Sequence, residues 1–383
     1  ASVEAESSPD PTADGSGAGG SHPRRPTAGL LGLGVLIGIA ALTRNEAIWI
    51  GLAWLISVWL VPGLAARRRV AMVAVPAVVA LLIFIPWAIR DWREFGNPLP
   101  GQALVNALSI TGSDVFAWKD QPTLARYLAI GPARLLELRV EGIAHNLFSV
   151  LVLPGIPTGA IGLLALPWLA RLRAARPTFL VGAITFLATS LLFPVSTTWG
   201  TFLHAAGPVH VLLIVGALLA LDALLDRVGR FRGWTKPVAW LGAGLTLSGC
   251  VLFSAAILPG YARSAETIRD RYVALAQQLP SSGIAIAGSG PVISDFPIWL
   301  ADTLDVPAVA LPAEPPTNVL DLARTFGSTL LVTSGGPDGV WPAILDAGGP
   351  GTECFQEVPL APPSDPILAA AIRGTRAFRV VCQ

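Results

Sequence analysis

The residues of this sequence that can do chemistry are few, and they interrupt or end long apolar runs. Arg44 and Glu46 stand between two such runs, in the stretch LTRNE (42–46). Ionisable side chains at membrane depth or at the ends of spans are often functional. Two interpretations of this pair stay open. It holds two helices together, or Arg44 faces a lipid-linked phosphate, because a guanidinium matches phosphate oxygens bidentately.

Two further candidates lie along the chain. Arg90 and Asp91 occur where an apolar run ends, in PWAIRDWREFGNPLP (86–100). A helix end with solvated charges is the favoured interpretation there, and substrate binding is the alternative. The uncharged stretch TTWGTFLHAAGP (197–208) contains Trp199 and His204. Aromatic and hydroxyl groups suit a sugar, and a neutral His can move protons or contact phosphate; a structural role for His204 is equally open.

Motifs for cofactors are missing from the sequence. It contains no His-Glu-x-x-His, no Cys-x-x-Cys, no Gly-x-Ser-x-Gly and no Walker loop, which argues against an ATP-driven pump. The stretch Gly288-Ser289-Gly290 favours a turn over a nucleotide loop, because a third Gly is missing and Pro291 removes an amide donor. We therefore identify no cofactor, and a need for a divalent cation cannot be derived from the sequence.

Composition indicates which elements position these residues. The 383 residues are 53% hydrophobic and only 13% charged, against about 25% charge in soluble domains. A net charge of +1 gives no reason to expect a nucleic-acid partner. We predict a polytopic α-helical membrane domain of about seven spans. The predicted spans are Ala28–Thr43, Ala47–Val61, Val70–Ile89, Thr158–Ala170, Thr178–Phe193, Val209–Leu225 and Pro237–Leu258.

Charge distribution predicts the orientation of the spans. Basic clusters such as Arg67 to Arg69 fall in short loops with little acid, which the positive-inside rule places in the cytoplasm. The loop from Arg90 to Glu141 balances six basic with six acidic residues, and the loop 194–208 has no basic residue. These loops and the C-terminus are then extracytoplasmic. Abundant Arg, Ala, Gly and Pro suggest a bacterial protein, and hence a multi-pass protein of the bacterial plasma membrane.

The domain prediction has three parts. Residues 1–27 are rich in Ser, Gly, Pro and acid and are predicted to be a disordered cytoplasmic segment. Residues 28–259 form the transmembrane domain, with a long outer loop at 90–142. Residues 260–383 form a small extracytoplasmic α/β domain with a mainly parallel sheet, because helical and strand patterns alternate there. The predicted helices are 262–279, which is amphipathic, 296–304 and 318–326, and the predicted strands are 283–287, 308–311, 329–333 and 377–382. Cys354 and Cys382 could form a disulfide in this domain, although the sequence cannot give their separation.

Several of these stretches resemble a known family. The run GLLGLGVLIGIAALTRNEAIWIGLAWL (29–55) resembles the Gly-x-x-x-Leu-Thr-Arg-x-Glu region of bacterial GT-C glycosyltransferases, which include protein O-mannosyltransferases and aminoarabinose transferases. A basic loop, RRR (67–69), and the pattern in PWAIRDWREFGNPLP follow as in many of these enzymes. The stretch PVISDFPIWLADTLDVPAVALP (291–312) is similar to the extracytoplasmic tail of some of them. The resemblance covers most of residues 28–333.

The resemblance implies a hexosyltransferase that moves a sugar from a polyprenyl-phosphate donor to a glycan, lipid or protein acceptor outside the cytoplasm. It also implies an acidic catalytic residue in the first outer loop, and no residue of this chain corresponds to it. We therefore expect this chain to be the C-terminal part of a longer protein, inactive alone, with the catalytic residue upstream. Arg44 or Arg90 would contact the donor phosphate. The alternatives are a transporter or flippase of lipid-linked saccharides, and a non-enzymatic membrane scaffold with a binding domain.

Overall fold

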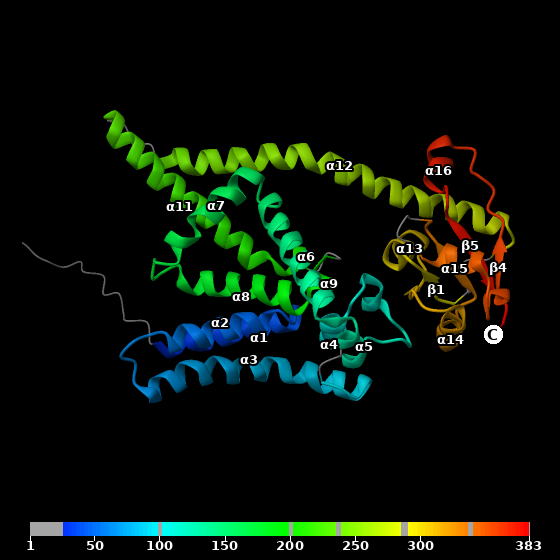
Figure 1. The fold of residues 1–383 in the computed structure, drawn as a ribbon, viewed down its shortest axis with the longest axis horizontal. Coiled ribbons are helices and arrows are strands. Elements are labelled where there is room, and N and C mark those ends of the chain that lie inside the picture. Colours follow the sequence, from blue (N-terminus) through cyan, green and yellow to red (C-terminus); the bar gives the residue numbers. More distant parts are fainter. Residues whose placement is uncertain are drawn as a thin grey trace, which may run out of the picture. The chain divides into compact units, whose positions relative to one another are not determined.

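A computed structural model describes residues 26–98, 102–198, 202–234, 239–284, 290–335 and 340–382. Most of the predicted disordered segment, residues 1–25, lies outside the described residues. The chain divides into two compact units, residues 1–90 and 91–383. Helices fill the first unit and most of the second, and a small sheet lies near the C-terminus (Figure 1).

The first unit consists of three apolar helices. Gly34 and Gly38 let two of them approach closely, because a Cβ on Gly34 would lie 2.7 Å from Cβ of Val79 and one on Gly38 would lie 2.9 Å from Cβ of Ile83. The second contact lies four residues after the first on both helices, so the two helices run parallel. The helices are α1 (Pro26–Thr43), α2 (Ala47–Trp59) and α3 (Ala66–Phe95), of which α3 continues into the second unit.

The second unit continues with helices of very different length. Small residues again allow close packing: a Cβ on Gly162 of α7 would overlap the backbone carbonyl oxygen of Leu213 in α11, and one on Gly216 would lie 2.7 Å from Leu169. The helices are α4 (Gln102–Leu108), η1 (Gly112–Phe116), α5 (Leu124–Ala129), α6 (Gly131–Val152), α7 (Ile156–Leu169), α8 (Arg176–Leu192), α9 (Pro194–Ser196), α10 (Phe202–Ala205), α11 (Gly207–Arg232) and α12 (Ala239–Ser281).

The prediction of seven spans is not supported. Three helices in the described part of the chain are long and apolar enough to cross a membrane, namely Ala66–Phe95, Gly207–Arg232 and Trp240–Ser281. A fourth crossing is possible if α6 and α7, which meet at a 115° bend, act as one span. The helices Thr27–Thr43, Ala47–Trp59 and Arg176–Leu192 are apolar but shorter, and fewer than about 20 residues do not cover a hydrocarbon core of about 30 Å.

The longest helix, α12, links the apolar helices to the sheet (Figure 1). Its 43 residues extend about 64 Å at 1.5 Å per residue. The predicted span 237–258 and the predicted amphipathic helix 262–279 are therefore parts of one helix, which continues through Pro259. Its last turns carry Tyr272, Leu275 and Leu279 into the core of the sheet domain.

The sheet has five strands in the order β2-β1-β3-β5-β4. It is mixed and not mainly parallel: β1 pairs parallel with β2 and β3, whereas β5 pairs antiparallel with β3 and β4. The predicted strand 283–287 falls largely on residues that the structure does not describe. The strands are β1 (Val292–Ser294), β2 (Ala308–Ala310), β3 (Leu330–Thr333), β4 (Phe355–Val358) and β5 (Arg376–Val380).

Alternate strand residues serve two cores, one on each face of the sheet. Val292 and Leu330 join the α12 residues on one face, while Ile293 and Leu331 face the other core. The connecting helices of this domain are α13 (Pro297–Leu304), α14 (Pro316–Phe326), α15 (Trp341–Ala347), η3 (Thr352–Cys354) and α16 (Pro366–Ala371).

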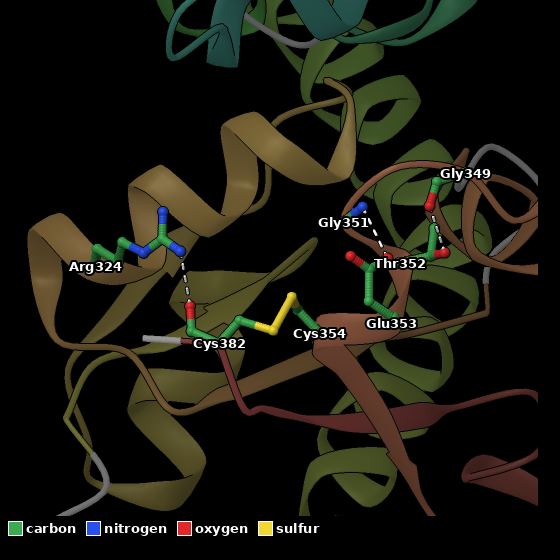
Figure 2. The surroundings of a disulfide bond; sticks show 7 residues. All are labelled: Arg324, Gly349, Gly351, Thr352, Glu353, Cys354 and Cys382. Atoms are coloured by element: carbon green, nitrogen blue, oxygen red, sulfur yellow. Dashed lines mark hydrogen bonds between the residues drawn. A yellow bond between two sulfur atoms is a disulfide. The ribbon is translucent and has the colours of Figure 1, made fainter.

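A disulfide joins Cys354 and Cys382, with an S–S distance of 2.05 Å and a Cα–Cα distance of 5.1 Å. Figure 2 shows how it closes the end of the β4–β5 pair. Next to it, the guanidinium of Arg324 donates a hydrogen bond to the carbonyl oxygen of Cys382 at 3.0 Å. The third cysteine, Cys250, lies on α12 and is free.

Candidate functional site

Arg44 and Glu46 lie in the tight turn between α1 and α2. Arg44 donates two hydrogen bonds to Glu46, from Nη2 to Oε1 at 2.6 Å and from Nε to Oε2 at 3.0 Å. The pair is partly exposed, with 40% of the Arg44 side chain accessible. Its hydrogen bond to Glu46 raises the pKa of Arg44 above its usual value. These two hydrogen bonds give the pair a defined geometry, as the structural interpretation expects. The other N–H donors of the Arg44 guanidinium can still reach a ligand.

Arg90 lies at the same end of the first unit as Arg44. The parallel packing of α1 and α3 places Gly38 beside Ile83. Arg44 follows Gly38 by six residues, and Arg90 follows Ile83 by seven, which is about 9 and 10.5 Å of helical rise. Both residues therefore lie near one level of the unit. Arg90 is exposed, and its Cζ lies 4.6 Å from the centroid of the Trp87 ring.

Asp91 does not share the exposure of Arg90. It is 3% exposed, whereas Arg90 is an exposed residue of the preceding unit. A helix rotates about 100° between neighbouring residues, which explains how adjacent charges take different environments. The two residues therefore do not form the single charged edge that the sequence suggests.

Two residues that follow α8 in the sequence, Phe202 and Pro208, lie beside earlier turns of α8. The ring of Phe202 packs against the ring of Phe186, with centroids 6.1 Å apart. Farther along, the carbonyl oxygen of Pro208 lies 3.7 Å from the place of a Cβ on Gly182. These two α8 positions lie about 9 and 15 Å before the end of the helix at Leu192. Residues 194–208, which the sequence predicts to be an outer loop, include the short helices α9 and α10 and the start of α11.

Buried polar side chains surround the start of this re-entrant segment (194–206), of which residues 194–198 and 202–206 are described. Asn146 of α6, which is fully buried, donates from Nδ2 to Oγ of Ser190 at 2.9 Å. Its Oδ1 accepts a hydrogen bond from Oγ1 of Thr197 at 3.0 Å. Three elements, α6, α8 and the segment itself, therefore meet at one amide group. Sequence reasoning overlooked Asn146, although a lone amide within an apolar helix was a usable signal.

The two named candidates of this segment have different outcomes. His204 lies on the short helix α10 and is exposed. Trp199 lies outside the described residues. Thr197 is buried, with 1% of its surface exposed.

The carboxyl ends of the neighbouring strands β1 and β3 form a switch point of the sheet, which is where ligands of open α/β sheets bind. Here Asp295 follows β1 and Ser334 follows β3. The carboxylate of Asp295 accepts hydrogen bonds from the backbone N–H of Ser334 at 2.8 Å and from its hydroxyl at 2.7 Å. The two strand ends are thus tied to each other. Among the described residues, no group of three or more His, Cys, Asp or Glu side chains could hold a metal ion.

No protein-family model matches this chain, and it has no match among the curated proteins or the solved structures. The resemblance to GT-C glycosyltransferases therefore depends on its sequence motifs alone. The structure places the charged residues of those motifs, Arg44, Glu46 and Arg90, at the ends of apolar helices.

Proposed function

We propose that this chain is part of a GT-C type membrane glycosyltransferase that binds a polyprenyl-phosphate sugar donor at the extracytoplasmic face. The observation that carries the proposal is the common level of Arg44 and Arg90 at one end of the first unit. A polyprenyl-phosphate donor consists of a long apolar chain that ends in a phosphate. Its site needs apolar helix surface beside a cation at the boundary, and the first unit has both.

The exposed surface of these helices supports the same proposal. Leu36 on α1 and Leu82 on α3 are 67% and 63% exposed, which suits contact with lipid and with a polyprenyl tail. Phosphate oxygens bind guanidinium groups through charge-assisted hydrogen bonds, which contribute about 1.5–3 kcal/mol each. Two such groups are enough to favour a lipid phosphate over a neutral lipid.

Charge asymmetry supports the orientation. Three consecutive basic residues, Arg67 to Arg69, lie at the start of α3, whereas Arg90, Asp91, Arg93 and Glu94 balance one another at its other end. The positive-inside rule places the unbalanced end in the cytoplasm. Arg44 and Arg90 then face the extracytoplasmic side, where the acceptor and the sheet domain would lie in a bacterial plasma membrane.

The test is donor binding and transfer by the full-length protein in nanodiscs. Arg44→Ala and Arg90→Ala should each weaken binding of a polyprenyl-phosphate sugar about tenfold or more, from the loss of about 1.5–3 kcal/mol. Arg67→Ala, at the opposite end of α3, is the matched control and should bind normally. Normal binding in both variants would refute the site, and absence of transfer from every lipid-linked donor would refute the function.

A flippase of lipid-linked saccharides is the second candidate, because the re-entrant segment favours it. Transporters bind substrates at discontinuous helices near the middle of the membrane, and the short helices α9 and α10 interrupt the chain between the longer helices α8 and α11. Reconstitution into liposomes separates the two functions. A flippase would move a labelled saccharide lipid between leaflets without forming a glycosidic bond, whereas the transferase would give a glycosylated acceptor.

A further inference from the structure

A buried carboxylate on the sheet domain holds a loop that is almost 200 residues earlier in the sequence. Glu314, just before α14, is 4% exposed. It accepts hydrogen bonds from the backbone N–H groups of Trp118, Lys119 and Asp120, with shortest distances of 2.6, 2.9 and 3.1 Å. Asn318 donates a further hydrogen bond at 2.9 Å. Successive N–H groups that converge on one anion form a nest, and here the anion is the protein's own side chain.

Side chains on both sides of the nest strengthen this attachment. The Trp118 ring packs against the ring of Phe326, with centroids 5.8 Å apart, and belongs to one core of the sheet domain. Its Nε1 donates a hydrogen bond to Asp321 at 3.1 Å. Lys119 forms an ion pair with the same carboxylate at 2.9 Å. The contact therefore combines a buried charge, an aromatic anchor and an exposed ion pair.

The other end of this loop contacts the re-entrant segment. Asp114, in η1, is 5% exposed and accepts hydrogen bonds from the N–H groups of Ile110 and Thr111 at 2.8 and 2.9 Å. It also pairs with Arg126 at 2.8 Å. These bonds fix the conformation of residues 109–126. Both η1 and α4 pack against α9, the first turn of the re-entrant segment.

We propose that Glu314 is a positioning residue through which the sheet domain sets the conformation of the re-entrant segment. In the described part of the chain, the sheet domain is attached through the continuous helix α12 and through the Glu314 nest. Helix α12 alone would let the domain bend relative to the loop, and the nest prevents this. Because η1 contacts both the nest loop and α9, movement of the domain is transmitted to Thr197 and its bond with Asn146. This proposal is independent of the reaction that the protein performs.

Hydrogen exchange of the full chain in nanodiscs tests the proposal without an activity assay. In Glu314→Ala, the amides of residues 118–120 lose their acceptor and should exchange at least tenfold faster. The amides of residues 195–198 should also exchange severalfold faster, while those of β5 stay unchanged. Unchanged exchange at 118–120 would overturn the nest, and unchanged exchange at 195–198 would overturn the coupling.

Three further variants make the result specific. Glu353→Gln removes a carboxylate of the same domain that accepts from the N–H of Gly351 at 3.0 Å (Figure 2), and it should leave both segments unchanged. Asp321→Asn removes the ion pair with Lys119 and weakens the hydrogen bond from Nε1 of Trp118, and it should have a smaller effect than Glu314→Ala. If Glu314→Ala also accelerates amide exchange in β5, Glu314→Gln replaces it, because this variant keeps the side-chain volume. Its exchange at residues 118–120 and 195–198 then tests the nest and the coupling.

Discussion

Removal of the Cys354–Cys382 disulfide should destabilise the sheet domain while the apolar helices keep their structure. The bond closes the chain between η3 and the end of β5, a sequence separation of 28 residues. Its loss lets the unfolded domain explore more conformations, and the folded contacts of β4 and β5 do not change. The perturbation is the double substitution Cys354→Ala with Cys382→Ala in the full chain.

The size of the effect follows from the length of the closed loop. For about 28 residues, the loop-closure entropy is about 12 cal/mol/K, which corresponds to about 3.6 kcal/mol at 25 °C. A difference of 1.36 kcal/mol is one factor of ten, so the opening equilibrium of the domain should rise about 400-fold. Residual structure in the unfolded state reduces this value, and about 2 kcal/mol, or about 30-fold, is the lower bound that we expect.

Hydrogen exchange of the strand amides measures this opening equilibrium in the intact protein. The slowest amides of β3 and β5 report unfolding of the domain, and the amides of α7 and α11 serve as an internal reference. Cys250→Ala is the matched control, because this free cysteine lies on α12 and contacts the carbonyl oxygen of Pro154. Less than tenfold acceleration of β5, or equal acceleration of α7, would refute the reasoning.

Three other predictions concern separate parts of the second unit. Gly162→Ala should separate α7 from α11 and lower the thermal stability by about 1–3 kcal/mol, from overpacking, whereas Gly249→Ala should have little effect, because its nearest neighbour is 3.9 Å away. Asn146→Ala should destabilise the helices by about 1–2 kcal/mol, from two lost hydrogen bonds, measured by thermal unfolding in detergent. The hydrogen bond with Arg376 lowers the pKa of Glu357 below its usual 4.5. The contribution of this hydrogen bond to stability is therefore present above pH 4.5 and is lost as the pH falls through the lowered pKa of Glu357. Glu357→Gln should remove this part of the acid sensitivity of the unfolding free energy, measured in urea titrations.

Local sequence patterns were sufficient for elements that depend on neighbouring residues. The break LTRNE between two apolar runs corresponds to the turn between α1 and α2, because three polar residues interrupt the helix there. The amphipathic pattern at 262–279 corresponds to the last part of α12. Alternating helical and strand patterns indicated the sheet domain, whose helices α13 and α14 lie close to the predicted ranges 296–304 and 318–326.

The same patterns could not give the number of crossings. Hydropathy reports that a segment avoids water, and a helix of 13 residues such as α2 satisfies that condition without the length of a span. A bend such as the one between α6 and α7 depends on packing, and Gly155, with a φ of +87°, is only a weak local sign of it. Likewise, hydropathy assigned residues 194–208 to a loop, whereas the described part of this range contains the short helices α9 and α10 and the start of α11.

The contacts that sequence reasoning missed share one physical property, which separates them from the candidates that it found. Glu314, Asn146 and Asp295 each use a buried or partly buried polar group to join segments that are 39 or more residues apart. A buried polar group without its partner costs about 1–3 kcal/mol, so these side chains enforce one arrangement of the segments. Arg44 and Arg90 are exposed at helix ends, where a surface pair contributes little to stability. The buried groups therefore specify the fold of the second unit, whereas the role of the exposed arginines must be sought in binding rather than in stability.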